Sequence, residues 1–136
     1  MIEINVRKET SVDLSDCSQE ALDSLGTLDT LRVNGDLFLY NCTGLTKLPE
    51  GLKVNMGLYL NGCAGLRELP DGLTVGMNLV LYGCSGLTKL PEDLNVGEVI
   101  RSDSNTGFSG HKDDPGVIPK HLKDKLSIAW LSWISW

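Results

Sequence analysis

The sequence has little from which a catalytic site could be built. Histidine occurs only twice, at His111 and His121, and no Gly-x-Ser-x-Gly, P-loop or His-Glu-x-x-His motif is present. The common signatures of nucleophilic hydrolases, phosphate-binding loops and zinc proteases are therefore missing. We predict that the protein is not an enzyme and that it uses no cofactor and no metal.

Long apolar runs are missing as well. The longest apolar-leaning stretch, 126–136, is only 11 residues long and is interrupted by serines, whereas a helix needs about 20 residues to cross a bilayer. No apolar segment near Met1 has the form of a secretion signal. With 22% charged residues, 41% hydrophobic residues and a formal charge of −6, the composition is typical of a soluble globular chain. We expect one cytoplasmic domain spanning residues 1–136.

A strict 21-residue repeat is the main feature that is present. Its form is Leu-x-Leu-x-x-Cys-x-Gly-Leu-x-x-Leu-Pro-x-x-Leu-x-Val, and three copies occupy residues 37–54, 58–75 and 79–96. A period of this length indicates one small unit that is stacked on copies of itself. The Leu-x-Leu alternation predicts short strands that form a parallel sheet, with both leucines pointing inward. The proline favours an extended or 3₁₀ return path, because 21 residues leave little room for a helix.

A fourth, degenerate copy follows in phase. Ile100 and Ser102 stand where the Leu-x-Leu pair recurs, Asn105 stands at the cysteine position and Phe108 stands at that of the next leucine. We therefore expect a stack of about four strands, or five with the N-terminal part.

Caps are expected at both ends, because an open stack exposes its apolar core. Residues 2–6 alternate like a strand, and residues 18–25 follow N-cap residues and end at Gly26. At the other end Pro119 is followed by apolar residues at helical spacing up to Trp133. The predicted organisation is an N-terminal strand and helix cap over 1–30, repeats over 31–108, and a loop with a C-terminal cap helix over 109–136.

The repeat resembles the leucine-rich-repeat family, whose consensus is matched by Leu37, Leu39, Cys42 and Leu45 and by their copies. The short period and the recurring Leu-Pro are similar to the bacterial and phage subclass, which includes secreted effectors that bind a host partner. This resemblance implies an α/β repeat fold with a parallel sheet on its concave face, and a role in protein–protein interaction. No cysteine is followed two residues later by aspartate, so the catalytic motif of the effector ubiquitin ligases is absent.

The cysteines at position 42 and its copies form a row in the predicted stack. Zinc needs sulfur atoms that converge on one ion, which a row of parallel side chains does not provide. A cytoplasmic chain also keeps its thiols reduced. We predict buried thiols that line the turn in place of asparagine amides, while Cys17 belongs to the N-terminal cap.

Partner binding is predicted on the outward side of the Leu-x-Leu strands, where side chains recur in columns every 21 residues. These columns are aromatic and weakly polar, and Tyr and Arg often anchor protein interfaces. We expect the protein to act by occlusion or as an adaptor for a protein partner; the alternative is that the rings only strengthen the sheet by cross-strand stacking. The predicted residues are Phe38, Tyr40, Tyr59, Asn61, Tyr82, Arg101 and Asp103.

Two other functions remain open from the sequence. Residues 1–36 carry eight acids and three bases, so this part could imitate nucleic-acid phosphates, as in a phage- or mobile-element-encoded inhibitor of a nucleic-acid-handling defence enzyme; the protein itself is not expected to bind nucleic acid. The tryptophans at the C-terminus could cover the stack, contact a membrane or form a homodimer. The acidic surface consists of Asp13, Asp16, Glu20, Asp23, Asp29 and Asp36, and the tryptophans are Trp130, Trp133 and Trp136.

Overall fold

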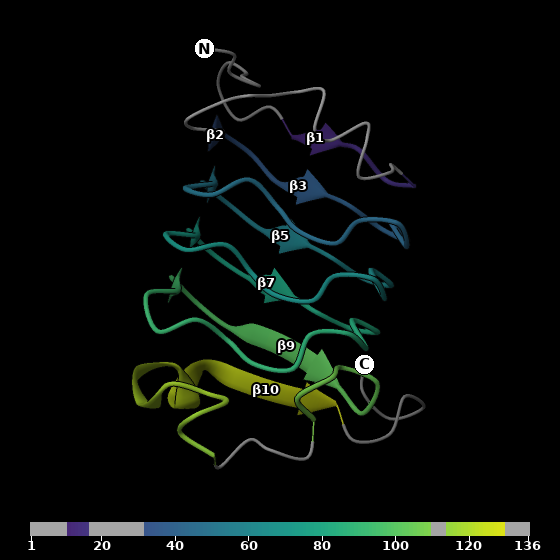
Figure 1. The fold of residues 1–136 in the computed structure, drawn as a ribbon. Coiled ribbons are helices and arrows are strands. Elements are labelled where there is room, and N and C mark those ends of the chain that lie inside the picture. The colour runs from purple at the N-terminus through teal and green to yellow at the C-terminus, as the bar shows by residue number, and fades with distance from the viewer. Residues whose placement is uncertain (1–10, 17–31, 110–113, 130–136) are drawn as a thin grey trace.

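The computed structural model describes residues 11–16, 32–109 and 114–129. In this part the chain forms a parallel β-solenoid of about three turns with a spacing of about 21 residues, and its strands stack one below another (Figure 1). The repeat architecture predicted from the period is thus confirmed. The only helix among the described residues is the 3₁₀ helix η1 (Lys120–Lys125), so the α/β class is not confirmed.

The longer of two sheets is built from the Leu-x-Leu segments. All neighbouring strands in it are parallel, and Leu37 pairs with Leu58, which pairs with Leu79, which pairs with Ile100. This is the predicted 21-residue register. The order of its six strands is β1 (Val12–Asp13), β3 (Leu37–Phe38), β5 (Leu58–Tyr59), β7 (Leu79–Val80), β9 (Ile100–Asp103) and β10 (Leu126–Ala129).

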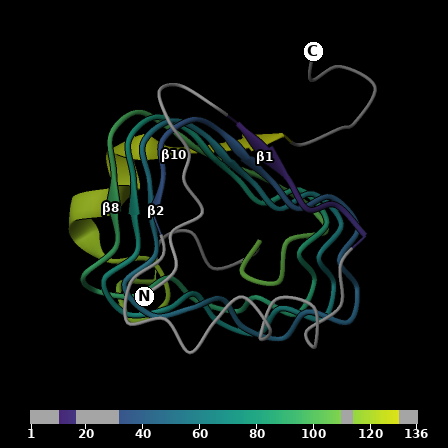
Figure 2. The same ribbon diagram turned by 90° about the horizontal axis from the view of Figure 1, so that it is seen from above.

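A second parallel sheet occupies the return path of each coil. Its four strands are β2 (Arg32–Val33), β4 (Lys53–Val54), β6 (Thr74–Val75) and β8 (Asn95–Val96). The extended return path was predicted, whereas its pairing into a sheet was not. Viewed along the stack, the coils nearly superimpose (Figure 2). The outward face of the longer sheet is therefore close to flat along the stack, in contrast to the predicted concave surface.

The repeated letters form the interior of the solenoid. Leucines of both arms, such as Leu60 and Leu73, and valines such as Val54 are at most 1% exposed. Cys63 and Cys84 are also fully buried, and their Sγ atoms donate to the backbone oxygens of Leu39 and Leu60 in the preceding coil, at 2.9 and 3.1 Å. The predicted row of buried thiols is confirmed, and it joins each coil to its neighbour.

The last coil departs from the predicted register at the cysteine position. Asn105 is exposed, and Thr106 instead is 1% exposed and donates its hydroxyl to Leu81 O at 2.8 Å. The placement of Asn105 in the row was therefore wrong by one residue. Asp103 Oδ1 accepts hydrogen bonds from Asn105 N and Thr106 Oγ1, and this turn brings Thr106 inward. Phe108 is fully buried, as its alignment with Leu87 predicted.

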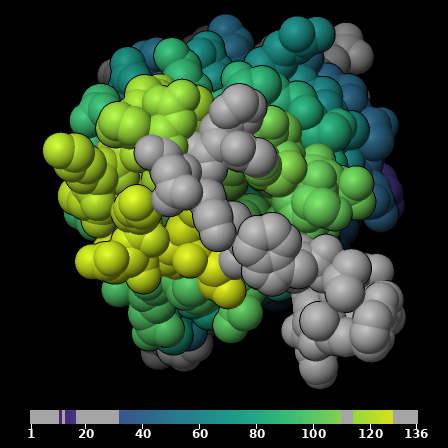
Figure 3. All heavy atoms as spheres, turned by 90° about the horizontal axis from the view of Figure 1, so that it is seen from below, coloured from purple at the N-terminus to yellow at the C-terminus, as the bar shows by residue number. Residues whose placement is uncertain are grey.

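The predicted C-terminal helix was also wrong in the described residues. After Pro119 the chain forms η1 and then β10, which pairs along its whole length with β9. The open edge of β9 offers unpaired backbone groups, and satisfying these outweighs a helical preference that is only moderate in Leu-Ser-Ile-Ala. The segment still caps the stack: Ile118 and Leu122 are buried, and His121 and Lys125 bond to the oxygens of Leu94 and Gly97. Figure 3 shows η1 and β10 over this end.

The strands extend further than the predicted four or five. β1 pairs with β3 at an offset of 25 residues, Val12 with Leu37, so a longer coil precedes the strict repeats. Outside the described residues lie the predicted strand over 2–6, the predicted helix over 18–25, Cys17, His111 and the three tryptophans.

Candidate protein-binding surface

The outward face of the longer sheet carries a cluster of aromatic side chains, called here the aromatic patch: Phe38, Tyr40 and Tyr59. Phe38 and Tyr59 are register partners on β3 and β5, and their rings stack with centroids 4.9 Å apart and an interplanar angle of 19°. Tyr40 is tilted against both, at 5.7 and 6.3 Å. All three are half-buried. The repeat therefore brings these predicted residues together.

A glycine two residues before Tyr59 makes room for its ring. A Cβ atom on Gly57 would lie 2.7 to 2.9 Å from the ring atoms and hydroxyl of Tyr59, closer than real Cβ contacts. The ring of Tyr59 thus lies over the backbone of its own strand as well as against Phe38. This contact fixes the orientation of the ring, so that little side-chain entropy remains to be lost on binding.

Charges of both signs lie close to the patch. The pKa of Tyr59 is raised above its ordinary value, first by burial and then by the negative charge of Asp36 and by Tyr40, while Arg101 acts in the opposite direction. Asp36 is held in place because its Oδ1 accepts the Gly57 backbone N–H at 2.7 Å. The phenol therefore stays neutral and able to donate a hydrogen bond near neutral pH.

The other predicted face residues have mixed surroundings. Asn61 and Tyr82 are half-buried, and Arg101 is exposed. Asp103 is half-buried, and its Oδ1 is used by the fold, since it accepts from Gly83 N as well as from the turn described above. Val80 was expected to be an outward residue but is only 5% exposed, because its short side chain lies between the longer register partners Tyr59 and Arg101.

Only half of the predicted acidic surface lies in the described residues. Asp13 and Asp16 are exposed, while Asp36 is half-buried and hydrogen-bonded. The pKa of Asp13 is lowered by hydrogen bonds from Ser15. Glu20, Asp23 and Asp29 lie outside the described residues.

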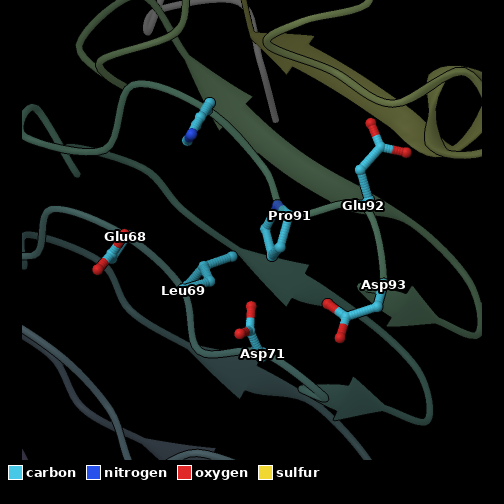
Figure 4. Close-up of a pocket in the computed structure, with 7 residues that line it drawn as sticks. Glu68, Leu69, Asp71, Pro91, Glu92 and Asp93 are labelled. Atoms are coloured by element: carbon cyan, nitrogen blue, oxygen red, sulfur yellow. The ribbon is translucent and has the colours of Figure 1, made fainter.

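A second acidic feature lies on the opposite side of the coils, as a groove of about 490 Å³. Its floor contains Leu69 and Pro91, and Asp93 points toward Asp71 while Glu92 points away from both (Figure 4). Asp93 Oδ2 accepts the Gly72 backbone N–H at 2.9 Å. Across the described ranges, no group of three His, Cys, Asp or Glu side chains is arranged to hold a metal ion. The groove is lined by Glu68, Leu69, Asp71, Lys89, Pro91, Glu92 and Asp93.

The buried thiols are poor nucleophiles. Burial raises the pKa of Cys63 to about 11 and that of Cys84 to about 12, so the reactive thiolate is scarce near neutral pH. Both groups are also inaccessible, since each side chain is fully buried.

Comparison with known proteins gives no relative: no protein-family model, no curated protein and no solved structure matches the chain. In the part of the chain that the structure describes, no helix is long and apolar enough to cross a membrane.

Proposed function

We propose that this protein is a non-enzymatic binding module that holds a protein partner on the outward face of its longer sheet, and that it acts by occlusion or as an adaptor. The observation that carries the proposal is the aromatic patch. Phe38 and Tyr59 are stacked and half-buried on a face where repeat letters are free to vary. Large rings held in one orientation bury much area at low entropic cost, as binding hot spots do.

The distribution of residue types supports the same function. Leucine, cysteine and valine of the repeat serve the interior, whereas the outward positions carry aromatic, amide and charged side chains. The resemblance to leucine-rich repeats is consistent with the parallel strands formed by Leu-x-Leu. Within this proposal, the second sheet on the return path makes the coil a divergent form of that repeat.

Affinity capture with matched variants tests the proposal. The full chain, its Tyr40→Ala/Tyr59→Ala variant and a Lys53→Ala/Thr74→Ala control on the second sheet are used as bait at low concentration. We expect the wild type and the control to capture the same partner and the tyrosine variant to lose it by at least tenfold, since two hot-spot rings contribute on the order of 2 kcal/mol or more. Equal capture by the tyrosine variant and the control, with both folded by circular dichroism, would refute the proposal.

A further inference from the structure

Charge changes sign along the outward face of the longer sheet. Asp13 is exposed on β1 and Asp36 lies next to β3. At the other end Arg101 is exposed on β9, and Lys125 directly precedes β10. The aromatic patch and Val80 lie between these ends. The face thus runs from an acidic end through an apolar centre to a basic end.

We propose that this face binds a second copy of the chain. The two copies pack face to face about a twofold axis that lies between them, parallel to the strands and midway between β5 and β7. The inference rests on the proposed function, because it uses the same surface, and it assigns that surface one specific occupant. Two packed sheets lie about 10 Å apart, which leaves room for interlocking side chains.

The sheet register determines which side chains meet in this arrangement. The axis reverses the order of the strands, so β3 faces β9 of the other copy and β5 faces β7. Phe38 then lies opposite Arg101, and Tyr59 lies opposite Val80. A guanidinium on an aromatic ring and a ring on an aliphatic side chain are both favourable contacts.

The charges at the two ends are complementary in the same arrangement. β1 faces β10 of the other copy, and its neighbour across the interface is β9. Asp13 therefore lies within reach of the long side chains of Arg101 and Lys125. Asp103, the acid at the basic end, comes opposite the Tyr40 hydroxyl, which can donate to its second carboxylate oxygen. Each pair occurs twice because of the symmetry.

The alternative face-to-face arrangement is electrostatically unfavourable. An axis along the stack places every strand against the same strand of the other copy. Asp13 then meets Asp13 and Arg101 meets Arg101, and such like-charge contacts disfavour a complex. The gradient of charge along the face therefore selects one orientation of the second copy.

The area of the face indicates a weak dimer. Six strands at about 4.8 Å spacing and about five residues along each strand give roughly 400 Å² per copy in projection. Stable interfaces bury about 1,200 to 2,000 Å² in total. We expect a dissociation constant above about 1 μM, so that a tighter protein partner displaces the second copy.

Sedimentation velocity with a charge exchange tests the dimer. The full chain is measured from about 10 μM to about 1 mM, and the Asp13→Lys and Arg101→Glu variants are measured alone and mixed. Both residues are exposed in the single chain, so we expect the variants to keep the wild-type circular dichroism and melting temperature. Each variant alone faces like charges and should dimerise at least tenfold more weakly; their mixture restores opposite charges at both symmetric contacts and should dimerise like the wild type.

A wild type that stays monomeric over this range, or a mixture that dimerises no better than either variant alone, would overturn the dimer. If either variant fails to fold, the wild type decides by its salt dependence: dimerisation must weaken when the ionic strength is raised. Failure of the proposed function looks different. Arg101→Glu keeps the aromatic patch and should still capture a heterologous partner, so a monomeric wild type that captures one refutes only the dimer, and a dimer that captures none refutes only the partner.

Discussion

Alanine in place of one repeat glycine tests how closely the coils are stacked. Gly44 and Gly86 occupy the same position of the repeat, so the sequence treats them alike. A Cβ atom on Gly86 would lie 2.8 Å from Ala64 O and 3.0 Å from Leu66 O, both backbone atoms of the coil before it. At Gly44 no described atom lies within 4 Å of such a Cβ. Only the structure distinguishes the two glycines.

The expected cost follows from these distances. Ordinary contacts begin at 3.4 Å, so two carbonyl groups must retreat by about 0.5 Å, and they cannot rotate away as a flexible side chain would. Overpacking of this kind costs about 1 to 3 kcal/mol. Gly44→Ala has no such cost and restricts the unfolded chain, which stabilises by about 0.4 to 1 kcal/mol. We expect the unfolding free energies of the two variants to differ by about 2 kcal/mol or more.

Urea unfolding followed by circular dichroism measures this difference through the transition midpoint at constant slope. The two variants have identical composition, so effects on the unfolded chain cancel in the comparison. Equal midpoints for Gly44→Ala and Gly86→Ala would show that the coils are not in contact in the register described.

Two further predictions concern buried polar groups. Because the folded pKa values of Cys63 and Cys84 are about 11 and 12, against 9.0 as the ordinary value, their stabilising effect is complete below pH 9 and is lost as the pH rises through the folded values; the urea midpoint should fall between pH 8 and pH 10 by more in the wild type than in Cys63→Val/Cys84→Val, and equal falls would contradict the raised pKa values. Ser102 is fully buried and its hydroxyl has no hydrogen-bond partner, so Ser102→Ala should keep or raise the melting temperature, by up to about 1 kcal/mol of unfolding free energy; a clear loss of stability would show that the hydroxyl has a partner.

The sequence was sufficient for the repeating part of the fold because each copy states the same physical demand. Leu37, Leu58 and Leu79 must all point inward, and a 21-residue offset is the one register that stacks them. The second sheet was harder to predict, since its two-residue strands, such as Lys53–Val54, carry little alternation of their own and form by pairing with neighbouring coils.

The ends were not predictable from the same rules. Residues 126–129 have helical spacing and strand-forming backbone edges at once, and the open edge of β9 decides between them. At the surface, the repeat predicted which side chains face outward but not their depth: Val80 is buried by its taller neighbours, and the Asp103 carboxylate serves the turn at Thr106. Such outcomes depend on contacts between coils that a single repeat does not contain.

The in-register stacking of the coils has a consequence for how the chain can change in length. A coil such as residues 58–78 meets the coil before it and the coil after it through the same pairings. Duplication of one whole 21-residue segment would lengthen both sheets by one strand, about 4.8 Å, without creating a new type of interface. An insertion of a single residue in a strand would turn every following side chain to the opposite face. The extra residue before Thr106 is tolerated because it falls in a turn. The outward face can therefore grow or shrink only in whole coils, and each step adds or removes one row of surface side chains.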